Sequence, residues 1–273
     1  MSTRMRDAMG RLFKELRHEP TEKRVRVVLD GETIVDTTDA VLVWEPRRIV
    51  PTYAVPATDL RAEVTEAGEV TPGGPGLLHP GIPFTTHSTA GSSLDIAIGG
   101  ERRAGAGFRP ADPNLRDHVL LDFDAMDQWF EEEEEIHGHP RDPYHRVDSR
   151  ASTRHVRIED GGVLLAETNR PTLVFETNLP VRFYLPMEDV VADLTPSDQK
   201  TYCPYKGQAS YWSTDSRPNV VWSYERPLPD AGPIAELVAF YDDILDVTVD
   251  GKLRDRPGGA VVRSLREEFG VES

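Results

Sequence analysis

The sequence predicts a mainly β protein made of two tandem copies of one small domain, with one helix in each copy. The first observation is an internal repeat: residues 25–53 and residues 156–184 share identical residues at an offset of 156 − 25 = 131. The shared pairs are Val25/Val156, Arg26/Arg157, Gly31/Gly162, Thr37/Thr168, Leu42/Leu173, Val43/Val174, Glu45/Glu176, Val50/Val181 and Tyr53/Tyr184. The second observation is that both segments are rich in β-branched and aromatic residues, which favour strands. A repeat this long indicates paired domains rather than a solenoid of short units.

The second copy is predicted to be a series of strands followed by a helix. Alternating and β-branched patterns predict strands at 155–160, 163–168, 172–177, 181–186, 207–213 and 219–225, with tight turns at 161–162 and 214–218. Residues 232–245 predict the helix, because Ile234, Val238 and Tyr241 recur at helical spacing and Pro233 suits a first turn. A final strand and turn are predicted at 246–252.

The first copy is predicted to contain an insertion. MDQWFEE (126–132) aligns with LVAFYDD (237–243) at an offset of 237 − 126 = 111, so the first copy has 131 − 111 = 20 extra residues. The stretch 71–93 is rich in Gly, Pro, Ser and Thr, and we expect it to be a long loop. The alignment predicts a helix at 126–132, which the glutamates 131–135 continue on a solvated face.

These elements give the predicted domain boundaries. We expect an N-terminal helix within 1–23, a diverged domain at 24–148, a well-formed domain at 149–256 and a helical or frayed tail at 257–273. HPRDPYHRVDSR (139–150) is predicted to link the two domains, because its prolines interrupt helix formation.

Charge and composition narrow the function classes. The formal net charge is −16, which opposes nonspecific binding to nucleic acid or anionic lipid. The sequence has neither a run of about 18 apolar residues that could cross a bilayer nor the apolar core of a signal peptide. A single cysteine agrees with a reducing compartment. We therefore expect a cytoplasmic protein with no nucleic-acid or membrane partner.

The candidate site lies around TYCPYKGQASYW (201–212), which contains the only cysteine. Lysine and arginine side chains near aromatic rings predict a pocket for a small anionic or aromatic metabolite. Its predicted residues are Glu176, Arg182, Tyr184, Cys203, Tyr205, Lys206, Trp212, Trp222 and Tyr224.

Three alternatives remain open for these residues. They can form an enzyme site, in which Lys206 or Cys203 acts on the ligand and Glu176 serves as acid or base. They can instead form a core of rings in which Glu176 and Arg182 pair structurally. The protein can also be an interaction scaffold whose acidic first copy meets a basic partner.

Several motifs carry a family resemblance. RPTLVFETNLPVRFYLPMEDV (170–190), YCPYKGQASYW, VVWSYERP and IAELVAFYDD resemble the uncharacterised DUF427 family, and HPRDPYHRVD resembles the connector of its two-copy members. The resemblance covers about residues 24–253 and implies a compact Mss4-like, β-tent-type domain without an established activity. The first copy has no counterpart of the Cys-Pro-Tyr-Lys-Gly run.

Two activities associated with such families find little support in the residues. The family has carried a nucleotidyltransferase label, but Asp122 and Asp124 lack the usual spacing to Gly91-Ser92 and are expected to cap a helix. Mss4-like domains often hold zinc through paired CxxC motifs, which one cysteine cannot supply. His137, His139 and His145 are expected to be polar surface in the linker, and we predict no metal and no cofactor.

Overall fold

The computed structural model describes residues 2–258, and its contacts divide the chain into two compact units. Unit one ends at Asp142, and unit two begins at Pro143. The predicted tail lies, except for its first residues, outside the described residues. Helix α1 (Met5–Leu12) begins unit one and confirms the predicted N-terminal helix. None of the helices within residues 2–258 has the length and apolar character needed to span a membrane.

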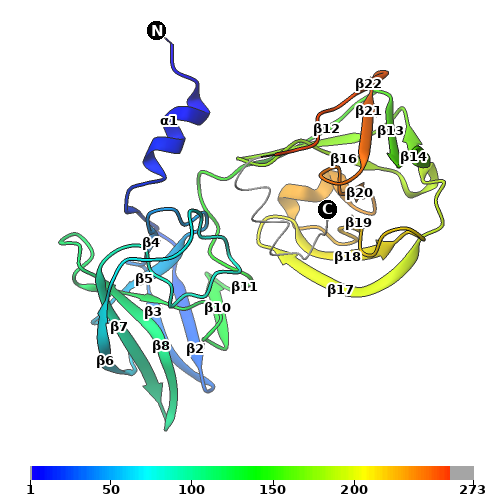
Figure 1. The fold of residues 1–273 in the computed structure, drawn as a ribbon. Helices are drawn as coiled ribbons and strands as arrows, with labels where there is room; N and C mark the ends of the chain where they lie inside the picture. The colour runs from blue at the N-terminus through cyan, green and yellow to red at the C-terminus, as the bar shows by residue number, and fades with distance from the viewer. Residues whose placement is uncertain (1, 259–273) are drawn as a thin grey trace. The chain divides into compact units, whose positions relative to one another are not determined.

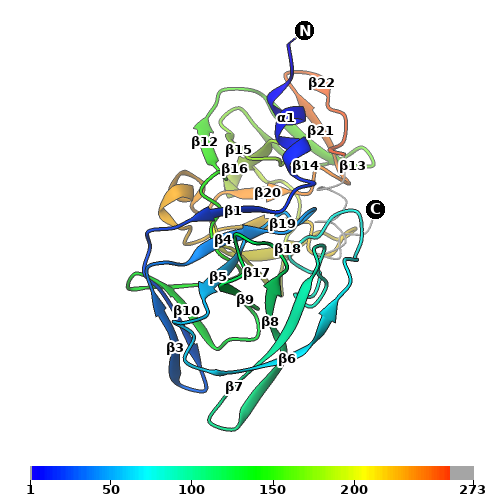
Figure 2. The ribbon, with the colours of Figure 1, turned by 90° about the vertical axis from the view of Figure 1, so that its left-hand side faces the viewer.

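Unit one contains a seven-stranded and a four-stranded antiparallel sheet (Figure 1). In spatial order, the larger sheet consists of β1 (Arg17–Pro20), β4 (Val41–Trp44), β5 (Thr52–Pro56), β9 (His118–Leu121), β8 (Glu101–Pro110), β7 (Gly91–Ile98) and β6 (Glu63–Val70). The smaller sheet consists of β11 (Glu134–Ile136), β10 (Gln128–Glu131), β2 (Val25–Leu29) and β3 (Glu32–Thr37). Figure 2 shows β1, β4 and β5 side by side at one end of the larger sheet.

Unit two repeats this topology strand for strand. Its larger sheet consists of β12 (Val147–Ala151), β15 (Thr172–Glu176), β16 (Arg182–Leu185), β20 (Val238–Phe240), β19 (Val221–Ser223), β18 (Gly207–Ser213) and β17 (Thr195–Cys203). Its smaller sheet consists of β14 (Val163–Thr168), β13 (Val156–Asp160), β21 (Asp246–Val249) and β22 (Lys252–Leu253). Both the mainly β class and the tandem duplication are thereby confirmed.

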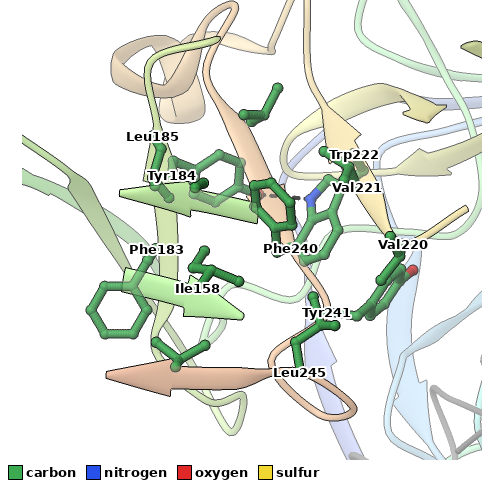
Figure 3. Close-up of a cluster of buried hydrophobic side chains, with 14 of the residues drawn as sticks. Ile158, Phe183, Tyr184, Leu185, Val220, Val221, Trp222, Phe240, Tyr241 and Leu245 are labelled. Atoms are coloured by element: carbon green, nitrogen blue, oxygen red, sulfur yellow. Dashed lines mark hydrogen bonds between the residues drawn. The ribbon is translucent and has the colours of Figure 1, made fainter. Parts of the chain in front are cut away.

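The core of unit two draws on both of its sheets. Ile158 from the smaller sheet packs in one cluster with Phe183 and Leu185 from the larger sheet (Figure 3). β13 shows the expected alternation of buried and part-buried positions, which places one face of the strand against the larger sheet.

The helix predicted at 232–245 is wrong. A 3-10 helix, η2 (Pro229–Ile234), is followed by the strand β20, which lies between β16 and β19. Val238, Ala239 and Phe240 are all buried because β20 is covered on both faces. A strand of this kind reads as a continuous apolar run, and its spacing also matches a helix.

The helix predicted at 126–132 is also wrong. Residues 128–136 form the hairpin β10–β11, whose turn at Glu132 has a φ of 52°. The glutamates 131–135 therefore belong to two strands and a turn. Asp122 and Asp124 precede a strand rather than capping a helix, and Oδ1 of Asp122 accepts a hydrogen bond from the Asp124 amide at 3.2 Å.

Strand pairing also corrects the repeat alignment. Val25 pairs with Glu131 and Val156 pairs with Val249, so the later offset is 249 − 131 = 118 rather than 111. The net insertion in unit one is then 131 − 118 = 13 residues. Residues 71–90 between β6 and β7 form a long loop, as expected, whereas residues 91–93 of the predicted loop begin β7.

A one-residue slip occurs before β5. Leu42 pairs with Tyr53, while its counterpart Leu173 pairs with Phe183. The structural counterpart of Tyr53 is therefore Phe183, and Tyr184 corresponds to Ala54. Because side chains alternate across a strand, this single residue moves the tyrosine to the opposite face of the sheet.

Candidate functional site

One face of the larger sheet in unit two carries most of the predicted site residues. Directly opposed residues of antiparallel strands point to the same side of a sheet. Tyr184 and Trp222 both pair with Ala239, and Tyr211 pairs with Trp222. Alternation along the strands adds four more predicted residues. We call this surface the tyrosine face, and it bears Glu176, Arg182, Tyr184, Cys203, Tyr211, Trp222 and Tyr224.

Trp212 is the predicted site residue that the fold separates from the others. It pairs with Val221, one position away from the Tyr211–Trp222 pair, and therefore points to the other face of the sheet. There it packs against the hydrophobic core of unit two. The sequence pattern places Trp212 near the lysine, but the register assigns it to the core.

Glu176, Lys206 and His145 form a buried ionic cluster at one end of the tyrosine face. Glu176 ends β15, and its side chain is 7% exposed. Oε2 of Glu176 accepts a hydrogen bond from Nζ of Lys206, and Oε1 lies 2.9 Å from Nε2 of His145. The two partners come from segments distant in the sequence, so this carboxylate ties three parts of unit two together.

Lys206 lies in the short turn that joins β17 to β18. Its amide donates to the carbonyl of Cys203 at 3.2 Å, and its own carbonyl accepts from the Leu228 amide at 3.1 Å. Gly207, with a φ of 95°, then returns the chain into β18. Lys206 is buried, and its ammonium lies 6.0 Å from the centre of the Tyr224 ring.

Aromatic side chains fill the middle of the tyrosine face. Nε1 of Trp222 donates a hydrogen bond to the hydroxyl of Tyr184 at 3.1 Å, as Figure 3 shows. The Trp222 ring also lies 4.6 Å from the Tyr241 ring, centre to centre. Tyr184, Trp222 and Tyr224 are each at most 8% exposed. These rings belong to the packed interior of the unit, as the structural alternative expected, but Glu176 and Arg182 pair with other side chains rather than with each other.

Arg182, in β16, also lies on this face and is paired with two carboxylates. One Nη donates to Asp242, and the other lies 2.8 Å from Oδ2 of Asp243. Its guanidinium also sits 5.7 Å from the centre of the Trp222 ring. Nη1 of Arg254 lies 3.4 Å from Oδ2 of Asp242. The two arginines therefore balance the charge of the two aspartates.

Pairing within the ionic cluster lowers the pKa of Glu176 and raises the pKa of Lys206. Burial alone would raise the pKa of Glu176, but Lys206 and His145 bring it down to about 2. Burial alone would lower the pKa of Lys206, but Cys203, Glu176 and Tyr184 raise it above its ordinary value. Burial raises the pKa of Tyr184 to about 12. At neutral pH the cluster therefore contains an ammonium, a carboxylate and a neutral phenol.

Cys203 and Tyr205 flank the lysine. Cys203 is part-exposed at the end of β17, and Tyr205 is buried. The Tyr205 ring stacks on the His145 ring, with 4.1 Å between centres and 22° between planes. The turn therefore supplies both the cation for Glu176 and the ring that holds the histidine.

Sequence reasoning missed His145, Asp242 and Asp243. His145 was assigned to polar linker surface, yet it contacts Glu176 and Tyr205. The two aspartates were placed in a helix that does not form. A signal for them existed in the sequence, because adjacent aspartates in an otherwise apolar run need a cation.

The linker histidines do not share a ligand. His145 faces Glu176, while Nδ1 of His139 lies 2.7 Å from the carbonyl oxygen of Pro140. Among residues 2–258, no three His, Cys, Asp or Glu side chains come together as a metal-binding group.

Unit one has an equivalent glutamate in a different setting. Oε2 of Glu45 lies 3.1 Å from Nδ1 of His87 and 3.5 Å from Nε of Arg48. Its Oε1 accepts from the Ser88 amide at 2.9 Å. The His87 ring stacks on Phe108, with 3.6 Å between centres. A histidine and a cation thus also lie next to this carboxylate.

The corresponding face in unit one lacks the tyrosine and tryptophan side chains of the tyrosine face. By strand pairing, Tyr184 corresponds to Ala54 and Trp222 to Phe108. Tyr211 corresponds to Ser93. The equivalent sheet of unit one therefore forms without the phenol and indole groups of the tyrosine face.

Two tandem copies of one two-sheet topology, each with a buried glutamate at the end of an equivalent strand, define a duplicated β protein. A family model described as a domain of unknown function, DUF427, matches residues 17–72 and 148–251, more than half of the chain. The chain belongs to this family. The first match ends at residue 72, within the first two residues of the loop 71–90, where the two units differ most in length. No curated protein matches the chain.

Proposed function

We propose that unit two binds a small anionic or aromatic molecule on the tyrosine face. The observation that carries this proposal is the contrast with unit one, whose sheet forms with Ala54 and Phe108 where unit two has Tyr184 and Trp222. Burying polar groups costs free energy unless each is well paired. Groups that the fold does not need, gathered with shifted pKa values on one face, are typical of functional sites.

The charges favour the aromatic part of this proposal. Lys206 is paired with Glu176, and Arg182 with Asp242 and Asp243, so an anionic ligand would have to displace a carboxylate. An aromatic ring can stack on tryptophan and tyrosine rings without displacing a carboxylate, although it must move packed side chains to reach rings that are at most 8% exposed. The ligand would enter where His145 and Arg182 remain 18% exposed.

An enzymatic role for Lys206 has less support. Its raised pKa keeps it an ammonium at neutral pH, and an ammonium is neither a nucleophile nor a base. The lowered pKa of Glu176 makes it a weak proton acceptor. Cys203 retains partial exposure beside the lysine, and it is the residue on which this alternative depends.

The proposal is tested by thermal shift with benzoate, 4-hydroxybenzoate, aniline and indole as probes. A specific ligand raises the melting temperature by mass action, and at 100 times its Kd it adds about 2.7 kcal/mol. We expect at least one probe to stabilise the wild type, and Trp222→Phe to weaken the effect.

The matched control is Phe108→Leu, which changes the equivalent ring in unit one and should leave the ligand response unchanged. Equal weakening by both variants, or no stabilisation by any probe at millimolar concentration, contradicts the proposal.

A further inference from the structure

Two histidines from unrelated segments reach the equivalent glutamates of the two units. His87 lies in the loop between β6 and β7. His145 lies just before β12, the first strand of unit two. The unit-one counterpart of β12 is β1, so the two histidines do not occupy equivalent positions in the repeat.

The two imidazoles nevertheless have the same kinds of neighbours. One nitrogen of each ring lies within hydrogen-bond distance of a glutamate oxygen: Nδ1 of His87 at 3.1 Å and Nε2 of His145 at 2.9 Å. Each ring stacks on an aromatic ring: His87 on Phe108 at 11° between planes, and His145 on Tyr205 at 22°. A basic side chain, Arg48 or Lys206, faces the same carboxylate.

This recurrence indicates that the glutamate itself selects an imidazole. The basic side chain keeps the carboxylate ionised, and an ionised carboxylate accepts a strong hydrogen bond from a ring N–H. The neighbouring aromatic ring covers the flat face of the imidazole. Two different segments each place an imidazole against this glutamate. The need for an imidazole therefore belongs to the position of the glutamate in the sheet rather than to the segment that supplies the histidine.

The two imidazoles differ in how firmly they are held. The His87 side chain is 1% exposed, and its loop is fastened by the Ser88 amide to Glu45 and by Arg48 to the carbonyl of Thr86. The His145 side chain is 18% exposed, and it lies two residues after the start of unit two. His145 is thus the imidazole that an external ring can replace.

We propose that Glu176 accepts an imidazole-type ring from outside the chain in place of His145, between the carboxylate and Tyr205. This inference rests on the proposed function, because it names the ligand class for one end of the tyrosine face. The ring donates an N–H to Oε1 of Glu176 and stacks on the turn 203–207. Its source is either a free heterocycle or a histidine side chain of a peptide.

The test is chemical rescue of His145→Ala by imidazole. The variant should melt several degrees below the wild type, and tens of millimolar imidazole at about pH 8.5 should restore most of that loss. 1-Methylimidazole, which is mainly neutral and lacks an N–H at that pH, should restore less than half as much. His139→Ala is the matched control, because it removes a histidine from the same segment without touching Glu176. Equal imidazole effects on wild type, His139→Ala and His145→Ala overturn the inference.

Two further arms identify the source and protect the test. Binding of Gly-His-Gly but not Gly-Ala-Gly at concentrations below those needed for imidazole assigns the ring to a peptide, and the reverse order assigns it to a free heterocycle. Should His145→Ala fail to fold, imidazole is titrated into the wild type while the NMR signals of His145 and Tyr205 are followed. Unchanged signals overturn the inference.

The outcome is separable from that of the proposed function. Stabilisation of the wild type by an aromatic probe, without rescue of His145→Ala by imidazole, rejects the imidazole class and leaves the binding proposal standing. Rescue without any aromatic probe binding to the wild type supports the imidazole site at Glu176 and rejects the wider role of the tyrosine face.

Discussion

Glu45 in unit one and Glu176 in unit two lie at equivalent positions in the larger sheets of their units, and each side chain is buried next to a histidine and a cation. In unit one the histidine comes from the inserted loop and the cation from the residue three positions along the chain. In unit two they come from the segment before β12 and from the turn between β17 and β18. A buried carboxylate is tolerated only when it is paired and hydrogen-bonded. The comparison teaches that the sheet position sets this requirement, while the diverged connections supply different solutions.

The units diverge more strongly beside the glutamate. Unit one covers the equivalent face with His87 stacked on Phe108, and it has Ala54 where unit two has Tyr184. Unit two has a short turn in place of the loop and fills the face with Tyr184 and Trp222. The short turn and the tyrosines therefore occur together on the tyrosine face of unit two.

The largest expected effect comes from removing the cation of unit two. Lys206→Met leaves Glu176 buried with His145 alone, and we expect a loss of about 3–5 kcal/mol in the free energy of unfolding of unit two. Denaturant titration measures this loss. The double variant Lys206→Met with Glu176→Gln should be more stable than Lys206→Met itself. A loss below about 1 kcal/mol would show that the pair of Lys206 and Glu176 contributes little to the stability of unit two.

Acid should change the stability of the two units differently. The folded pKa of Glu176 is about 2 against an ordinary value of 4.5, so its stabilisation is present above that ordinary value and is lost as the pH falls. A shift of this size corresponds to about 3 kcal/mol between pH 5 and pH 2. Urea unfolding over this range measures it, and Glu176→Gln should flatten the dependence.

Asp122 in unit one should give the opposite dependence of stability on pH. Burial raises its pKa, so its contribution to stability improves as the pH falls through the raised value. The Asp122→Asn variant should therefore make the acid response of unit one less favourable. The same acid dependence in both units would contradict this assignment.

A smaller effect is expected from the arginine of the tyrosine face. Arg182→Met leaves Asp242 with Arg254 and removes the cation beside Asp243, so we expect a loss of about 2 kcal/mol. Thr52→Met is the matched change, because Thr52 is the structural counterpart of Arg182 in unit one. Thermal unfolding of both variants measures the contrast, and equal losses would remove it.

The smallest effect is expected from a single hydroxyl. Tyr184→Phe leaves the buried indole N–H of Trp222 without its acceptor, at a cost of about 1 kcal/mol. Near-ultraviolet circular dichroism should report the changed environment of Trp222. Tyr53→Phe in unit one removes a hydrogen bond to Glu131 instead and should leave the Trp222 signal unchanged.

Much of the architecture was predictable from local patterns. The repeat at 25–53 and 156–184 predicts the duplication. Alternation predicts β13, whereas β15 and β16, which are buried on both faces, are predicted by their β-branched and aromatic residues. The equivalence of Glu45 and Glu176 is visible in the same alignment. The insertion in the first copy is predicted by its Gly and Pro content.

What the tertiary structure alone decided depends on contacts between distant segments. β20 is a strand rather than a helix because it lies between β16 and β19, and its apolar spacing does not distinguish the two. A one-residue slip before β5 gives Tyr184 the place of Ala54, and the register of β18 turns Trp212 toward the core.

The sequence by itself determined two copies of one β topology and a glutamate at the same position in each, because strand patterns and the repeat are local. Only the folded chain decided that His145 and Lys206 meet Glu176, because these residues come from segments about 30 positions away on either side. Hydrogen bonds across such separations depend on strand order and register, which no local pattern specifies.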